Sequence, residues 1–163
     1  MESPPTRYLS AIYGLLRQRT AAEWKRRWAQ GSKGGHVRQL NAEPSRAIRM
    51  LHAGREKAHS SILTQLRTGK IGFNAFLHER RVPTVQSPRC ACGLGAMTVR
   101  HVLLMCPQWT SLREEYIRPL RSTNLGTILN SAKGCDAAVR FILRSQLLEQ
   151  FKGIACEPPA VPQ

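Results

Sequence analysis

Residues 90–107 read CACGLGAMTVRHVLLMCP and bring Cys90, Cys92, His101 and Cys106 into one short stretch of chain. The spacing, C-x-C-x8-H-x4-C, offers four sulfur and nitrogen donors, the set that a tetrahedral zinc ion takes from a protein. Glycines follow the cysteine pair and permit the tight turn that lets both thiols face one ion. Because four protein ligands leave no open position for water, the pattern predicts a structural zinc ion and no catalytic one. The alternative is a loop with two free cysteines, a buried Cys106 and an ordinary histidine.

The separation of His101 and Cys106 along the chain sets a condition on this site. On an ideal α-helix, residues at this separation differ by about 500°, so the two side chains would point about 140° apart. They can share one metal ion only if the helix distorts or ends near Cys106, and Pro107 stands where a chain leaves a helix. Thr98 is the predicted N-cap of the short helix that carries His101.

The charge balance points to a polyanionic partner. The chain of 163 residues has 25 Lys and Arg against 10 Asp and Glu, a formal net charge of +15, and arginine supplies most of it. Arginine presents a planar fork of donors that fits phosphate, so the excess favours RNA or DNA over acidic proteins or membranes. Zinc knuckles favour single strands, so we expect a single-stranded nucleic acid and no membrane as the partner. The candidate phosphate contacts are Lys25, Arg26, Arg27, Arg67, Lys70, Arg80, Arg81, Arg89 and Arg100.

The sequence also indicates the cellular compartment in which the protein is expected. It has no apolar run of the roughly 18 residues that a membrane-spanning helix needs, and its start lacks the features of a signal peptide. We therefore expect an intracellular protein, nuclear or cytoplasmic and not secreted. In a reducing compartment its five cysteines are expected to be metal ligands or free thiols.

Acidic residues are too scarce for most nucleic-acid chemistry. Asp136 is the only aspartate, and the glutamates are mostly scattered. Two-metal phosphoryl transfer needs several clustered carboxylates. We therefore assign no catalytic residue and expect no enzymatic activity of the chain by itself.

Apolar periodicity predicts a mostly α fold, a small irregular helical domain with a short CxCG…H….C zinc-knuckle-like element. A basic N-terminal helix is expected through Trp28, whose tryptophans either stack on bases or anchor the core. Ser60 or Ser61 is expected to open a central helix, and a last helix is expected over 137–151. The predicted segments are a basic helix with a Gly-rich break (1–35), a helical segment with the QLRTGK stretch and a basic loop (36–89), the zinc-knuckle-like element (90–107), C-terminal helices (108–152) and a disordered tail (153–163).

The stretch SILTQLRTGKIGFNAFLHERRV, followed by CACG, TVRHVLLMCPQW and SLREEY, resembles the C-terminal end of LINE-type (non-LTR) retrotransposon polyproteins, particularly fungal ones. That region lies downstream of the reverse transcriptase and, where present, the ribonuclease H domain. It carries a similar QLRTG segment and a zinc-knuckle-like element. The match runs from about Trp24 to Tyr116 and is most specific between Gln65 and Pro107. It implies the same four metal ligands and covers no catalytic domain of the family.

The sequence thus predicts a non-catalytic, zinc-binding, nucleic-acid-binding module derived from the C-terminal part of a retrotransposon reverse transcriptase polyprotein. Two alternatives stay open. One is an accessory subdomain of an RNA-directed DNA polymerase and ribonuclease H that functions only in the full-length protein. The other is a helical protein-interaction module.

Overall fold

The computed structural model describes residues 6–154 and 156, and within them the fold consists of helices and turns without a β-strand. The predicted mostly α fold is confirmed. No helix in this part of the chain is long and apolar enough to cross a membrane. The α-helices are α1 (Thr6–Gln30), α2 (Gly35–Leu40), α3 (Lys57–Thr68), α4 (Asn74–Glu79), α5 (Thr110–Tyr116), α6 (Leu125–Leu129) and α7 (Ala132–Ser145). Short 3-10 helices cover Arg46–Leu51, Pro107–Trp109, Arg118–Leu120 and Glu149–Phe151, and a π-helical turn covers His101–Met105.

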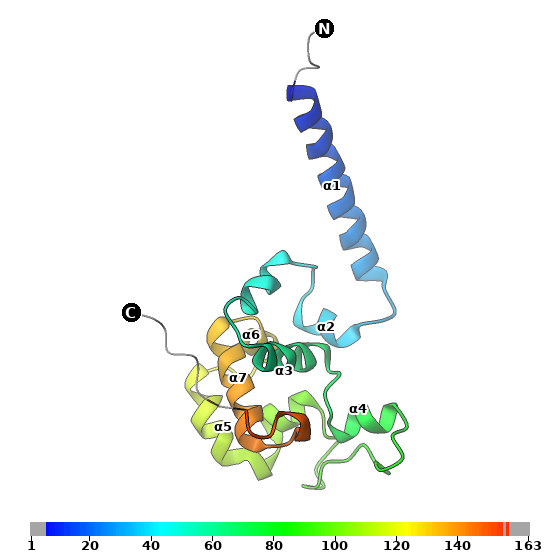
Figure 1. Ribbon diagram of the computed structural model, residues 1–163. Coiled ribbons are helices and arrows are strands. Elements are labelled where there is room, and N and C mark those ends of the chain that lie inside the picture. Colours follow the sequence, from blue (N-terminus) through cyan, green and yellow to red (C-terminus); the bar gives the residue numbers. More distant parts are fainter. Residues whose placement is uncertain (1–5, 155, 157–163) are drawn as a thin grey trace, which may run out of the picture. The chain divides into compact units, whose positions relative to one another are not determined.

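The chain divides into two compact units, Met1–Ser45 and Arg46–Gln163. In the first unit, α1 is one uninterrupted helix (Figure 1), as the apolar spacing predicts. The segment bounds expected from the sequence stay predictions. The expected disordered tail, 153–163, lies largely outside the described residues.

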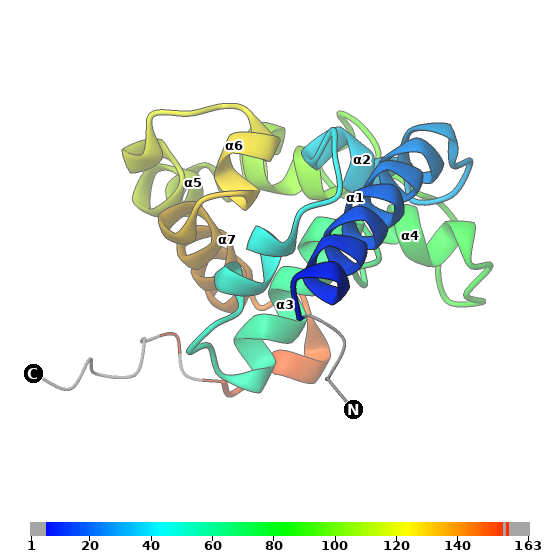
Figure 2. The same cartoon turned by 90° about the horizontal axis from the view of Figure 1, so that it is seen from above.

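The core of the second unit forms around α7, which packs against α3, α5 and α6 (Figures 1 and 2). Phe141 and Ile142 of α7 are 0% and 1% exposed, and Leu63 and Leu66 of α3 are fully buried. Leu63 and Leu66 are three residues apart, and the buried α7 residues Cys135, Ala138, Val139 and Ile142 repeat at three and four residues, the spacing of an amphipathic helix. The apolar stripes of α3 and α7 therefore account for the centre of the fold.

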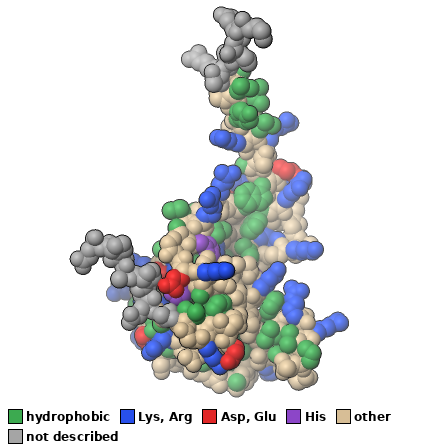
Figure 3. Space-filling model, in the orientation of Figure 1, with side chains coloured by type: hydrophobic (Ala, Val, Ile, Leu, Met, Phe, Trp, Pro, Cys, Tyr) green, Lys and Arg blue, Asp and Glu red, His purple; other side chains and the backbone are tan. Residues whose placement is uncertain are grey.

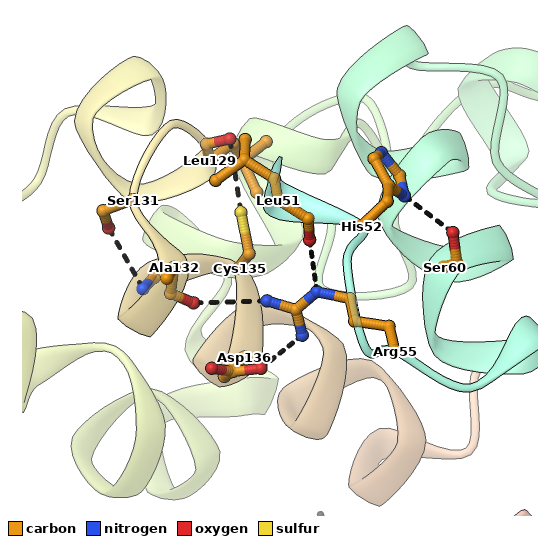
Figure 4. Close-up of polar contacts among 10 residues, drawn as sticks. Leu51, His52, Arg55, Ser60, Leu129, Ser131, Ala132, Cys135 and Asp136 are labelled. Atoms are coloured by element: carbon orange, nitrogen blue, oxygen red, sulfur yellow. Dashed lines mark hydrogen bonds and ion pairs between the residues drawn. The ribbon is translucent and has the colours of Figure 1, made fainter. Parts of the chain in front are cut away.

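Two arginines hold this core together through backbone carbonyls. The Arg67 side chain is 4% exposed and donates to the Leu129 carbonyl and to Asn130 Oδ1. Arg55 donates to the carbonyls of Leu51 and Ala132 and pairs with Asp136 (Figure 4). Burial lowers the pKa of the Arg67 guanidinium. Arg67 thereby contacts the last carbonyl of α6, and Arg55 contacts the last carbonyl of the 3-10 helix Arg46–Leu51. Carbonyls at helix ends have no acceptor role within their own helix.

The bounds of two helices differ from the sequence-based expectation. The last helix ends at Ser145, well short of residue 151, because Gln146 adopts left-handed backbone angles, φ 51° and ψ 24°. That turn returns Leu148 to the core, where it is 3% exposed. The central helix begins at Lys57, ahead of the expected serines, and the Ser60 hydroxyl contacts His52 Nδ1 at 2.6 Å instead of capping the helix (Figure 4).

The corner between α6 and α7 leaves no room for a side chain at Gly134. A Cβ placed there would lie 2.1 Å from the Ile128 carbonyl oxygen and 2.7 Å from the Ser131 hydroxyl. The same hydroxyl caps α7 by accepting from the Gly134 N–H at 3.1 Å. The turn therefore requires glycine for a close approach of two backbone segments.

We expect Gly134→Ala to lower the free energy of unfolding by about 1–3 kcal/mol, because the added methyl forces this corner apart. Denaturant unfolding followed by circular dichroism measures the change. Gly14→Ala is the control, since a Cβ at that helical position meets no atom within 4 Å apart from its own helix backbone and chain neighbours. Equal stability of the two variants would contradict the close packing of the α6–α7 corner.

Candidate metal centre

A π-helical turn resolves the awkward spacing of His101 and Cys106. The Cys106 N–H donates to the His101 carbonyl at 2.7 Å, a hydrogen bond that spans one residue more than an α-helical one. The wider turn brings the two side chains to the same side of the chain. The predicted distortion is present. Thr98 caps the segment as expected, since its hydroxyl accepts from the His101 N–H at 3.1 Å.

The two other donors lie on a tight loop. The Cys90 N–H donates to the Gly95 carbonyl at 2.8 Å, and the Gly93 N–H donates to the Cys90 carbonyl at 3.0 Å. Gly93 has φ 78°, a conformation that glycine adopts without strain. Folding back in this way turns the thiols of Cys90 and Cys92 toward the π-helical turn.

The four side chains lie close together and could hold one metal ion. Their ligand atoms all lie within 4.8 Å of one another. Cys90 Sγ and Cys106 Sγ are 3.6 Å apart, and Cys92 Sγ lies 3.2 Å from His101 Nε2. In a tetrahedral zinc site, neighbouring sulfur and nitrogen donors are about 3.3–3.8 Å apart. The donor set, and the two short distances within it, are therefore close to those of a tetrahedral cation held by three thiolates and one imidazole.

The surroundings shift the pKa values of two of the thiols in opposite directions. Cys106 is fully buried, and burial raises the pKa of its thiol to about 11. The backbone N–H of Leu94 lowers the pKa of the Cys92 thiol. Metal ions bind thiolates, so binding releases the protons that these thiols carry.

Arg113 of α5 supports the turn that carries two of the ligands. Its Nε donates to the Leu103 carbonyl at 3.2 Å, and its Nη2 donates to the Cys106 carbonyl. Outer contacts of this kind orient the ligands of metal sites. Nothing in the spacing of the cysteines points to Arg113, because it follows the last ligand on a separate helix.

The structure separates the predicted phosphate contacts into groups. Arg67 faces the core, so its guanidinium is unavailable to a ligand. Lys25 pairs with Glu43, and Arg26 and Arg27 pair with Glu23. The remaining candidates are exposed on the second unit: Lys70, Arg80, Arg81, Arg89 and Arg100. Lys and Arg outnumber acidic side chains on the face drawn in Figure 3.

Comparison with known proteins gives one informative relative. The chain is 31% identical over 100 residues to the retrovirus-related Pol polyprotein from type-1 retrotransposable element R1 of Bradysia coprophila. The chain contains a retrotransposon-related region. The match covers 61% of this chain but only 9% of the R1 polyprotein. No protein-family model and no solved structure matches.

We expect purified protein to carry one metal ion per chain and Cys92→Ser to lose it, because three ligands bind far more weakly than four. Elemental analysis after gel filtration measures the content. Since metal binding is coupled to folding, the variant should also lose helical circular dichroism. Cys156→Ser, which alters a cysteine outside the cluster, is the control and should retain the ion. Equal metal content in the two variants would contradict the assigned ligands.

We expect Arg113→Ala to weaken Zn²⁺ binding about 10-fold or more, because the turn loses its support. Competition with a chelating dye measures the affinity. Arg118→Ala is the matched control, since that exposed side chain pairs only with Glu114 among the described ion pairs. An unchanged affinity in Arg113→Ala would show that its carbonyl contacts do not position the ligands.

Proposed function

We propose that this chain is a non-catalytic module that binds a structural zinc ion and a single-stranded nucleic acid. The observation that carries the proposal is the convergence of Cys90, Cys92, His101 and Cys106 within 4.8 Å. Three sulfurs and one nitrogen favour zinc over the hard cations that prefer oxygen. Four protein ligands also make a closed site, whose role is to hold the fold.

Cations beside this centre support nucleic-acid binding. Arg89 and Arg100 are exposed and directly precede the ligands Cys90 and His101, so zinc fixes the backbone that presents them. Arg80 lies over the Phe76 ring, with its guanidinium carbon 5.3 Å from the ring centre. Its Nη2 also lies 3.9 Å from Glu79 Oε1, a long and exposed ion pair. A stacked arginine can still donate to phosphate through the edge of its guanidinium. Arg89 and Arg100 therefore give the zinc element exposed cations of its own, and Arg80 adds a further exposed cation on the second unit.

The origin we propose is the region downstream of the reverse transcriptase in LINE-type retrotransposon polyproteins, particularly fungal ones. The similarity to the R1 Pol polyprotein supports a retrotransposon origin. Since the chain spans 9% of that polyprotein, an accessory role within a full-length polymerase and ribonuclease H is the second candidate function.

A protein-interaction role has a specific observation in its favour. The first half of α1 exposes large apolar side chains, among them Tyr8 at 70% and Leu15 at 61%. By contrast, the apolar face of α7 is buried in the second unit. If α1 docks onto a protein partner, this function would coexist with the zinc element.

We expect the chain to bind a single-stranded oligonucleotide with a linear log–log dependence of affinity on salt, because bound cations release counterions. Replacing both Arg89 and Arg100 with Gln should reduce the slope by about 1.4, at about 0.7 per phosphate contact. Filter binding across a salt series measures it. Arg118→Gln is the control. Absence of retention at any salt concentration would contradict the proposal.

The non-catalytic part of the proposal has its own test. Polymerase and nuclease assays on the zinc-loaded chain should give no turnover above background. Activity that persists through purification and is lost in a variant of this chain would assign it an enzymatic function instead.

A further inference from the structure

The first unit contains a hollow that the zinc element does not explain. It measures about 480 Å³ and lies between the end of α1, the loop after it and α2. Its apolar wall includes Trp24 and Trp28, and its cationic rim includes Arg27, Lys33 and Arg38. A volume of this order is typical of pockets for small ligands, about 300–1,000 Å³.

The two tryptophans have different structural roles. Trp28 is half-buried, and its indole N–H donates to the Asn41 carbonyl at 3.2 Å, which fixes the ring between α1 and the chain after α2. Trp24 lies one turn earlier on the same side of the helix and is 47% exposed. Trp28 therefore anchors the unit, whereas Trp24 leaves a ring surface open.

Glycine in the loop lets a guanidinium reach the rim. A Cβ at Gly31 would lie 3.1 Å from Arg38 Nη1 and 3.2 Å from the Arg27 carbonyl oxygen. In its absence, Arg38 Nη1 donates to the Lys33 carbonyl across the loop. One nitrogen is thereby held by the loop, and the rest of the guanidinium fork remains for a ligand.

The charges on the rim are not compensated equally. Arg27 contacts Glu23 at 2.6 Å, and hydrogen bonds from Arg26 and Arg27 lower the pKa of Glu23 to about 2. Within residues 6–154, no carboxylate forms an ion pair with Lys33 or Arg38. The uncompensated positive charge of the hollow therefore lies at Lys33 and Arg38, beside an exposed indole.

We propose that this hollow binds one unpaired nucleotide of a nucleic-acid strand, with the base stacked on Trp24 and its phosphate on Lys33 and Arg38. The chemistry of the site matches both halves of that ligand: an aromatic surface for any base and paired cations for phosphate. This inference rests on the proposed function and adds a second contact, separate from the zinc element.

Fluorescence anisotropy with a short single-stranded oligonucleotide and the full zinc-loaded chain tests the site. Trp24→Ala should weaken binding about 5- to 100-fold, the range expected for one lost base stack. Tyr13→Ala is the matched control, because this α1 aromatic is 60% exposed and does not line the hollow. Trp24→Phe should bind within a few-fold of the unaltered chain, since it keeps a ring for stacking.

Two further measurements separate stacking from charge attraction. An abasic oligonucleotide of the same length should bind the unaltered chain more weakly and be insensitive to Trp24→Ala. Lys33→Gln should lower the log–log salt slope by about 0.7. If the abasic strand binds as tightly as the intact strand, the hollow binds anions in general and not a nucleotide. If polyglutamate competes at matched ionic strength, the hollow binds an acidic peptide and the proposed nucleotide site is overturned.

The outcomes distinguish the two proposals. If the unaltered chain binds with salt dependence but Trp24→Ala and Tyr13→Ala bind equally, the hollow is not the site and the proposed function stands. If the unaltered chain does not bind at all, the proposed function itself fails. Helical circular dichroism checks the fold of each variant. If Trp24→Ala loses helix, the nucleotide site is tested instead by the salt slope of Lys33→Gln and by the affinity of the abasic strand for the unaltered chain.

Discussion

The hydrogen bond from the Cys106 N–H to the His101 carbonyl is the constraint on which the metal centre depends. In an α-helix these residues would face different sides, and no ion could join them. One wider turn brings imidazole and thiolate together opposite the Cys90–Gly95 loop. A metal ion bound there would in turn hold this rarer geometry, because coordination would tie His101 to Cys106; wide turns of this type are frequent at functional sites. Backbone geometry and coordination thus support each other.

Arginine has two distinct roles in this chain. Arg55, Arg67 and Arg113 donate to backbone carbonyls. Those of Arg55 and Arg67 join segments more than 60 residues apart, Ala132 and Leu129 being 77 and 62 positions away. Arg89 and Arg100 face solvent and directly precede Cys90 and His101 of the candidate metal centre. A buried guanidinium needs partners for its donors, and unpaired carbonyls at helix ends supply them. Net charge therefore overstates the number of cations that a polyanion can contact.

The exposed cations differ in how available they are to a phosphate, because some are paired with carboxylates. The Lys-Arg-Arg run at 25–27 is paired with Glu23 and Glu43, which reduces the local potential that a phosphate would meet. Lys33, on the glycine-containing loop after α1, and Arg38, on α2, form none of the described ion pairs with carboxylates. Surface pairs contribute little to stability, but they do compete with an incoming anion for the same donors. Lys33 and Arg38 consequently have more positive charge available to an anion than the denser cluster within α1.

The sequence by itself determined the helical class, the four residues that come together at the candidate metal centre and the need for a distorted helix between the last two, because periodicity and ligand spacing are local properties of the chain. It also placed the cap at Thr98. Only the tertiary structure decided that Arg67 is internal, that Arg113 braces the metal turn and that the last helix ends at Ser145. These depend on which carbonyls and apolar surfaces meet in space. An arginine side chain is long enough to reach either the core or solvent, and the neighbouring sequence does not indicate which. Packing in the folded protein decides between these two positions.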